Sequence, residues 1–333
     1  MAQVSTDRSV RSLLRQGIEQ LRAAEVPWFT LAAELLLLHV ANQDRTWLYA
    51  HPEEMLPCET AEKYFALLHR RVLGEPTQHL TGKQEFWGLE FEVTPDVLIP
   101  RPETEHLIEV ALDRLAVHEL QAGRPTAKLI GENLTIVDIG TGSGCIAIAL
   151  AKELPAATIY ATDVSRAALE VARRNATHRG FSNRIHFLES NLLEAFRSNP
   201  VGAQHAASQP GTHSTKSASS HESRIASHKS LRFDLIISNP PYIGRQEGDS
   251  LPIEVREHEP ATALYGGQEG YELYGHLIPQ AAQFLKPGGL LILEFGHNSL
   301  PAVKPLLDSS TWHKIAVTKD LAGIPRVLSA QRI

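Results

Sequence analysis

The sequence predicts an α/β protein in which a mostly parallel sheet follows an all-helical segment. Three observations lead to this class. Apolar residues recur with a helical period through about the first 75 residues, and strand-like and helix-like segments alternate after Gly131. The chain of 333 residues is also long enough for about two domains. Alternating strands and helices are typical of a parallel sheet with right-handed crossovers.

The first segment is predicted to contain only helices. The apolar face of the first helix, within residues 5–24, is formed by Val10, Leu13, Leu14, Ile18 and Leu21. Pro27 ends this pattern, Thr30 is expected to cap a second helix, and residues 61–73 fit a third. These stripes are most simply core, with a partner-binding face as the alternative, and the segment carries no chemistry of its own.

Between this segment and the alternating part, the pattern changes twice. Residues 86–93 predict a short β-hairpin, and two prolines fix an irregular stretch at residues 98–105 before a helix that runs to about Leu120. We therefore divide the chain into a helical domain, a hairpin with a linking segment, and an α/β domain, at residues 1–80, 81–130 and 131–333.

The α/β part is predicted element by element. Strands are expected at residues 134–139, 158–162, 185–188, 233–238 and 290–295, with two more near 313–318 and 325–331. Helices are expected at residues 145–153, 165–179 and 271–285. Residues 197–230 break the alternation with nine Ser, four His and no aromatic residue, which predicts a disordered surface insertion. Its histidines, His205, His213, His221 and His228, match no compact ligand spacing, so we expect no metal.

Composition excludes several classes of protein. The net charge of −6 argues against a protein that binds mainly nucleic-acid backbones. Cys58 and Cys145 are too few and too far apart for a disulfide framework, and two reduced thiols are typical of a cytosolic protein. The apolar stretch at residues 134–151 contains Asp138 and glycines, so it fails as a membrane span. We expect a cytoplasmic monomer with no targeting segment and no membrane contact.

A glycine-rich turn at residues 138–144 follows the first predicted strand of the sheet. The order Asp138, Gly140, Gly142, Gly144 differs from the spacing that binds a pyrophosphate, and a carboxylate before the first glycine suits a cationic ligand. Asp163 ends the next strand, where a carboxylate can accept hydrogen bonds from ribose hydroxyls. A ligand that has a ribose, a positive charge and no phosphate is S-adenosylmethionine, so the two motifs together predict this cofactor. The alternative is that both aspartates only cap turns.

The string Asn239-Pro240-Pro241-Tyr242 follows another predicted strand. A planar NH2 group is a poor nucleophile, but two acceptors can hold its N–H bonds and aim its nitrogen at a methyl carbon. The side-chain oxygen of Asn239 and the carbonyl of Pro240 are such acceptors, the prolines fix the backbone, and Tyr242 offers a ring for stacking. The gain in rate would come mainly from alignment. The alternative is an ordinary turn.

Together these motifs resemble class I S-adenosylmethionine-dependent methyltransferases that methylate planar nitrogen. Within that class the chain closely resembles the peptide chain release factor glutamine methyltransferases, the HemK/PrmC family, over nearly its whole length apart from residues 197–230. Besides the two motifs, the resemblance rests on Thr81, Gly82, Phe86, Trp87, Gly88, Leu89, residues 98–105, Glu257, His258, Glu259, Pro260, Ala263, Leu264, Gly266, Gly267, Gly288, Gly289, Glu294, Arg326 and Val327.

The resemblance implies a Rossmann-like, seven-stranded methyltransferase domain behind a small helical domain that recognises the substrate. It implies methyl transfer from S-adenosylmethionine to the side-chain amide nitrogen of the glutamine in the Gly-Gly-Gln motif of release factors. The implied cofactor-binding residues are Asp138, Gly140, Thr141, Gly142, Ser143, Gly144, Asp163, Asn191, Leu192 and Asn239. The implied catalytic residues are Asn239, Pro240 and Tyr242, and the substrate amide is held by Asn239, Pro240, Pro241 and Tyr242. Asn191 and Leu192 stand where the family commonly has an Asp followed by an aromatic residue.

Two other functions stay open at this point. Adenine-N6 DNA methyltransferases share the Asn-Pro-Pro-Tyr string, but such an enzyme must flip a base and grip phosphates. The acidic balance and the absence of a second, basic domain in the sequence count against it. A non-enzymatic, cofactor-binding partner of the translation machinery is the other alternative, and the intact residues 239–242 disfavour it.

Overall fold

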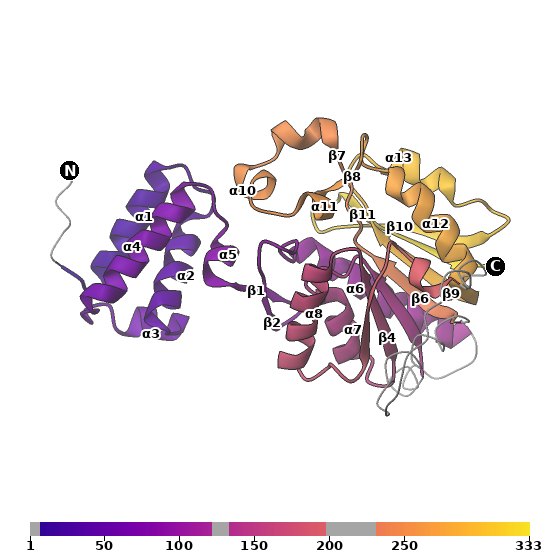
Figure 1. Cartoon of the computed structure of the whole chain (residues 1–333), viewed down its shortest axis with the longest axis horizontal. Helices are drawn as coiled ribbons and strands as arrows, with labels where there is room; N and C mark the ends of the chain where they lie inside the picture. Colours follow the sequence, from indigo (N-terminus) through magenta and orange to yellow (C-terminus); the bar gives the residue numbers. More distant parts are fainter. Residues whose placement is uncertain (1–6, 122–132, 198–230) are drawn as a thin grey trace, which may run out of the picture. The chain divides into compact units, whose positions relative to one another are not determined.

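The computed structural model describes residues 7–121, 133–197 and 231–333 (Figure 1). The chain divides into two compact units, residues 1–100 with 246–264 and residues 101–245 with 265–333. Except for Arg197, the insertion that we predict at residues 197–230 lies outside the described residues, and so do its four histidines. The domain boundaries at residues 80 and 130 stay a prediction. Within the described ranges, no helix combines the length and the apolar character needed to cross a membrane.

The first unit is built on helices, as predicted. They are α1 (Val10–Ala23), α2 (Phe29–Ala41), α3 (Arg45–Ala50), α4 (Cys58–Val72) and α5 (Thr77–Thr81). The predicted apolar face of α1 is confirmed as core, since Val10, Leu13 and Leu21 are buried. The prediction that Thr30 caps α2 is wrong. The helix already begins at Phe29, so Thr30 lies inside its first turn, and Trp28 precedes it with a left-handed φ of 53°.

A hairpin and a later segment complete this unit. Strands β1 (Lys83–Phe86) and β2 (Leu89–Glu92) pair antiparallel around a two-residue turn in which Trp87 and Gly88 have positive φ. The predicted hairpin is thus confirmed, but it begins at Lys83, three residues before the predicted start. Residues 246–264 carry the short helices α10 (Ile253–Arg256) and α11 (Ala261–Leu264). They return to the first unit, where Glu254 pairs with the buried Arg71 of α4 and Glu259 accepts a hydrogen bond from the backbone of Ile99 over 3.3 Å. The sequence gives no sign of this return.

The second unit contains a sheet of seven strands, which confirms the predicted α/β class. Their order is β10-β11-β9-β6-β3-β4-β5. Five of these strands, β9, β6, β3, β4 and β5, run parallel to one another. Strand β11 runs antiparallel to both of its neighbours, β9 and β10. The strands are β3 (Thr135–Ile139), β4 (Thr158–Asp163), β5 (Ile185–Glu189), β6 (Phe233–Ser238), β9 (Leu285–Glu294), β10 (Trp312–Lys319) and β11 (Pro325–Arg332).

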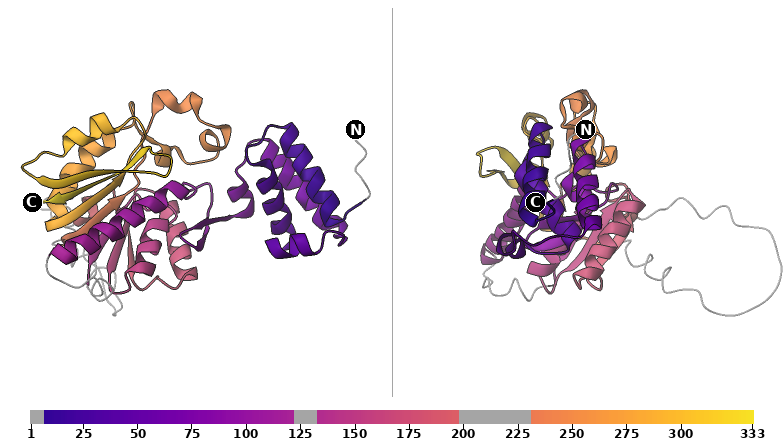
Figure 2. Two further views of the ribbon diagram at one scale, coloured as in Figure 1. Left: turned by 180° about the vertical axis from the view of Figure 1, so that it is seen from behind. Right: turned by 90° about the vertical axis from the view of Figure 1, so that its left-hand side faces the viewer.

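Helices cover both faces of this sheet (Figures 1 and 2). On one face lie α6 (Pro102–Gln121), α7 (Cys145–Glu153) and α8 (Arg166–His178), and on the other lie α12 (Glu272–Phe284) and α13 (Leu300–Val303). The predicted helices at residues 145–153, 165–179 and 271–285 are confirmed to within a residue at each end. Ser165 caps α8 by accepting a hydrogen bond from the backbone of Ala168, which fixes where that helix begins.

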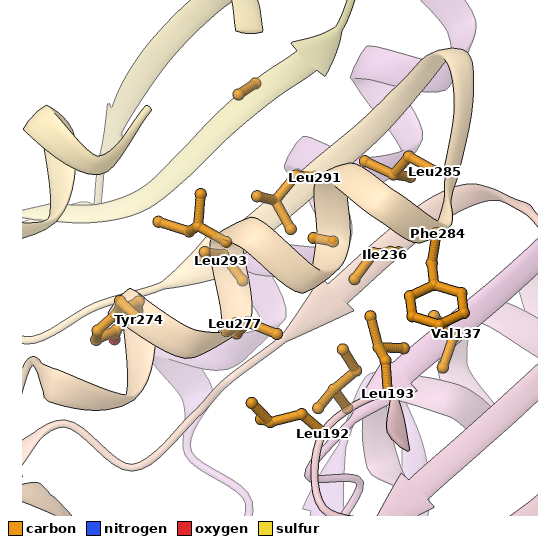
Figure 3. Packing of buried hydrophobic residues seen from close by; sticks show 14 of the residues in the cluster. Val137, Leu192, Leu193, Ile236, Tyr274, Leu277, Phe284, Leu285, Leu291 and Leu293 are labelled. Carbon is orange, nitrogen blue, oxygen red and sulfur yellow. The ribbon is translucent and has the colours of Figure 1, made fainter. Parts of the chain in front are cut away.

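The core under α12 follows from the period of two along the strands. Alternate residues of β9, such as Leu291 and Leu293, meet Leu277 and Phe284 of α12 together with Val137 of β3 (Figure 3). Residues between them, such as Leu290 and Ile292, are also buried, as expected for a parallel strand covered on both faces. This packing fixes the carboxyl ends of the strands, where the chemistry-bearing residues lie.

The two cysteines form no disulfide. Cys58 is exposed, Cys145 is buried, and both thiols are free.

Candidate active site

The predicted site residues leave neighbouring parallel strands at one edge of the sheet. Asp138 lies next to the end of β3, Asp163 ends β4, Asn191 follows β5, Asn239 follows β6, and Glu294 ends β9. Carboxyl ends of parallel strands meet at the same edge, and this edge is the usual place for ligands in open α/β sheets. Two motifs that are far apart in the sequence are therefore brought to one place.

The pairing register sets the acceptor motif beside the glycine-rich turn. Ser238 of β6 lies opposite Ile139 of β3, and its hydroxyl donates a hydrogen bond of 2.7 Å to the Ile139 carbonyl. The next residue on each strand is therefore Asn239 on one side and Gly140 on the other. The two predicted motifs begin as immediate neighbours.

The glycine-rich turn leaves open space beside its backbone. The backbone nitrogens of Gly140 and Thr141 both donate to the carbonyl of Thr162, over 2.8 and 2.9 Å, which ties the turn to β4. Gly140 and Gly142 have φ values of 70° and 55°, and a Cβ on either would meet no atom within 4 Å. Glycine is needed here for the left-handed backbone, and the open space would let a ligand approach the chain closely.

Asp138 is a buried carboxylate with one unused oxygen. Its side chain is 0% exposed, and Oδ2 accepts a hydrogen bond of 2.6 Å from the hydroxyl of Thr141. Oδ1 has no hydrogen-bond partner among the residues that the structure describes. Burial raises the pKa of Asp138 to about 7, against the opposing effect of the Thr141 hydroxyl. A cation at Oδ1 would stabilise the charged form, so the group fits a positively charged ligand.

Asp163 holds the turns after β3 and β4 together. Oδ2 accepts a hydrogen bond from the backbone nitrogen of Gly142 and Oδ1 accepts one from that of Ser165, each over 2.9 Å. Burial raises the pKa of Asp163, and these backbone donors act in the opposite direction. An ionised carboxylate has about four acceptor positions, so two remain for ligand hydroxyls. The residues present thus fit both the ribose and the charge of S-adenosylmethionine.

The other predicted cofactor residues differ in surroundings. The backbone carbonyl of Ser143 accepts a hydrogen bond of 2.9 Å from the side chain of Asn175, and Gly144 caps α7 with a φ of 82°. Asn191 is exposed, whereas Leu192 is only 9% exposed and belongs to the hydrophobic cluster of the sheet (Figure 3). Leu192 also has a left-handed φ of 52°, which is uncommon for a side chain with a Cβ. A cofactor contact at Asn191 and Leu192 stays a prediction.

Asn239 is oriented by a chain of hydrogen bonds. Its Nδ2 donates to the Oγ1 of Thr104 over 3.0 Å, and this hydroxyl donates to Oε2 of Glu294 over 2.8 Å. The hydroxyl of Tyr242 lies 3.4 Å from the other carboxylate oxygen, Oε1. Burial raises the pKa of Glu294 to about 7, opposed by the hydrogen bond from Thr104 and the charge of Arg326.

Glycines let a second strand pair approach the acceptor loop. Strand β7 (Ile243–Gly244) pairs with β8 (Tyr265–Gly267) directly after residues 239–242. A Cβ on Gly266 would overlap with the backbone oxygen of Pro241, and a Cβ on Gly270 would overlap with that of Tyr242. Only glycine permits this close backbone contact, so the segment at residues 265–270 holds the acceptor loop in place.

Two residues of this arrangement were not identified as functional from the sequence. The sequence includes Thr104 and Glu294 in the family resemblance but predicts no role for either residue. Nothing in their spacing links residue 104 to residues 239 and 294, because the contact depends on how α6 packs on the sheet. The one available signal is that both residues lie at an end of a secondary-structure element, since Thr104 is in the first turn of α6, which begins at Pro102, and Glu294 ends β9.

Comparisons with known proteins match both parts of the chain. Residues 12–82 match a family model described as the PrmC N-terminal domain, and residues 130–202 match one described as a methyltransferase domain. The release factor glutamine methyltransferase of Koribacter versatilis is 36% identical over 324 residues, covering 97% of this chain and 99% of that protein. The one from Moorella thermoacetica is 37% identical, again covering 97% and 99%.

A third relative covers both chains completely. The release factor glutamine methyltransferase of Rhodopirellula baltica is 34% identical over 335 residues, 100% of each chain. Such identity along the full length goes beyond a shared fold, and the motif residues named above lie where the structure builds one site. The resemblance that the sequence suggested is thus confirmed, and the chain belongs to the release factor glutamine methyltransferase family.

Proposed function

We propose that this protein transfers a methyl group from S-adenosylmethionine to the side-chain amide nitrogen of a glutamine, the one in the Gly-Gly-Gln motif of peptide chain release factors. One structural observation supports this most strongly. The NH2 group of Asn239 donates a hydrogen bond to Thr104. Within the described part of the chain, no group donates a hydrogen bond to Oδ1 of Asn239. An acceptor is therefore left free beside the glycine-rich turn. The names of the full-length relatives point to the same reaction.

The cofactor site would be formed by the turns after β3 and β4. When bound, S-adenosylmethionine supplies an electrophilic methyl group on a positively charged sulfur. Asp138 would compensate positive charge through Oδ1, and Asp163 would accept the ribose hydroxyls at its remaining positions. Gly140 and Gly142 leave space for the ligand beside the backbone. The register between β3 and β6 then brings the acceptor loop next to this site.

The acceptor loop would orient the substrate amide. Oδ1 of Asn239 and the carbonyl of Pro240 would each accept one N–H bond, which leaves the nitrogen facing the methyl carbon. The ring of Tyr242 would lie against the flat amide. The main contribution to the rate is alignment of two reacting atoms about 3–3.5 Å apart. No strong base is needed, because the proton can leave after the methyl group has been transferred.

The partner is proposed to be a protein and not a nucleic acid. The net charge of −6 disfavours a phosphate-gripping surface, and the sequence shows no second, basic recognition domain. We propose that the helical segment at residues 1–80 recognises the release factor, and that the enzyme acts in the cytoplasm as a monomer. Asn191 and Leu192 complete the proposed cofactor site on the side of β5.

A methyl-transfer assay tests this function against its alternatives. The protein would be incubated with labelled S-adenosylmethionine and either an unmethylated release factor or unmethylated DNA. We expect label on the release factor and none on the DNA. Equal or faster labelling of DNA would favour an adenine methyltransferase. A folded protein that binds the cofactor and labels neither substrate would favour the non-enzymatic alternative.

A further inference from the structure

We propose that Thr104 and Glu294 are positioning residues that fix which end of the Asn239 carboxamide faces the substrate. The inference deepens the proposed function and rests on it, since it assigns how the acceptor loop is set for a planar NH2 group. The three residues come from α6, β6 and β9, so the assembly exists only in the folded second unit.

The direction of the hydrogen bonds determines the orientation of the amide. A hydroxyl has one hydrogen, and the carboxyl group of Glu294 can only accept once it is ionised, which is its main form above pH 7. The hydroxyl of Thr104 lies 2.8 Å from Oε2 of Glu294, so its hydrogen goes to the carboxylate. The Thr104 hydroxyl then has only lone pairs to turn toward Asn239, whose Nδ2 lies 3.0 Å from Oγ1. They accept from Nδ2, and Oδ1 consequently points away from Thr104.

The opposite orientation of the amide would set two acceptors against each other. If the carboxamide turned by 180°, Oδ1 would face the lone pairs of Thr104, whose hydrogen is already donated to Glu294. Thr104 and Glu294 are each 2% exposed, so water has little access to replace the lost bond. A free Oδ1 on the substrate side is what an N–H donor requires. The flipped amide would present hydrogens to the hydrogens of the substrate.

Glu294 is itself held in place from other directions. Its backbone carbonyl accepts a hydrogen bond of 2.8 Å from the hydroxyl of Tyr274, which is fully buried in α12. Its Oε1 lies 3.4 Å from the hydroxyl of Tyr242, a second member of the acceptor loop. One buried carboxylate thus contacts Tyr242 directly and Asn239 through Thr104. Burying a carboxylate is costly, and a role in setting this loop accounts for its presence.

A substitution at Thr104 tests the proposal without touching the substrate contacts. Thr104→Val keeps the shape but removes the hydroxyl, whereas Thr104→Ser keeps the hydroxyl. We expect Thr104→Val to lower kcat on an unmethylated release factor by about 10²-fold, with KM and the Kd for S-adenosylmethionine changed by less than about twofold. Thr104→Ser should retain most of kcat. Ser329→Ala, which removes a buried hydroxyl that has no hydrogen-bond partner among the described residues, should behave as wild type and serves as the control.

The outcomes separate this inference from the function on which it rests. If the wild-type protein does not methylate the release factor, the proposed function fails, and the positioning role fails with it. If the wild type is active and Thr104→Val has the same kcat, only the positioning role fails. An equal loss in Thr104→Ser and Thr104→Val would show that packing matters and not the hydroxyl, which also overturns it. Should Thr104→Val not fold, Thr104→Ala replaces it in the same comparison.

Discussion

The backbone nitrogen of Gly142 donates a hydrogen bond of 2.9 Å to Oδ2 of Asp163. This bond joins the turn after β3 to the end of β4, and Oδ1 of the same carboxylate accepts from Ser165 at the start of α8. Asp163 therefore shapes the glycine-rich turn, and in the proposed cofactor site it would also offer acceptors to the ligand. Its removal should affect cofactor binding in two ways at once.

Replacing Asp163 by Asn tests this double role. The NH2 group of Asn cannot accept from a backbone donor, so one of the two turn bonds is lost together with the charge. Hydrogen bonds to charged groups contribute roughly 1.5–3 kcal/mol, so we expect the Kd for S-adenosylmethionine to rise about tenfold or more. Isothermal titration calorimetry measures it, with Asp249→Asn on the exposed surface as the control. An unchanged Kd for Asp163→Asn would contradict the assignment.

The affinity for the cofactor should depend on pH through Asp138. Burial raises the pKa of this carboxyl to about 7 in the protein without ligand. A cationic ligand stabilises the ionised form and so lowers that pKa, which means that binding releases a proton when the pH is below 7. The Kd should therefore increase as the pH falls from about 8 to about 6. Calorimetry in buffers of different ionisation enthalpy detects the released proton, and Asp138→Asn should abolish the release.

The stability of the protein should depend on pH through Glu294. Burial raises the pKa of this carboxyl from 4.5 to about 7, so its contribution to folding is fully present below pH 4.5 and is lost as the pH rises through 7. The groups that act on it are Thr104 and Glu103 of α6, Arg326 of β11, and Tyr242. The Tm of Glu294→Gln relative to wild type should increase between about pH 5 and about pH 8, because Gln does not ionise. A difference in Tm that stays constant over this range would contradict it.

Gly270 should tolerate no side chain. Its φ is 93°, and a Cβ would overlap with the backbone oxygen of Tyr242 and lie 2.7 Å from the nitrogen of Gly244. Gly270→Ala should therefore displace the acceptor loop, lowering both Tm and kcat. The matched control is Gly275→Ala within α12, where a Cβ meets no atom within 4 Å and the change should be neutral or stabilise by up to about 1 kcal/mol. Equal effects of the two substitutions would show that the loop does not need this contact.

The elements of the sheet could be predicted because their signals are local. A buried parallel strand such as Phe233–Ser238 is a continuous apolar run, and α7 begins right after its glycines. The short helices α3 and α5 were missed, since six and five residues are too few to show a period. The start of α2 was misplaced because Trp28 adopts a left-handed conformation that its residue type does not announce.

The sequence predicts those residues of the candidate site that belong to local motifs. Asp138, Asp163 and Asn239 each end or follow a strand, so a parallel sheet alone brings them to one edge. Thr104 and the return of residues 246–264 to the first unit depend on packing between segments distant in the sequence. No local pattern could reveal that a threonine at the start of α6 and a glutamate at the end of β9 set the orientation of Asn239.

Mass spectrometry of a release factor after incubation tests the proposed reaction most directly. An unmethylated release factor would be treated with S-adenosylmethionine and either wild-type protein or Asn239→Ala, digested, and sequenced to locate the added methyl group. We expect the wild type to add one methyl group, on the glutamine of the Gly-Gly-Gln motif. We expect Asn239→Ala to bind the cofactor normally and to methylate at least about 10²-fold more slowly. A methyl group on another residue, or equal methylation by Asn239→Ala, would contradict the proposed role of the acceptor loop.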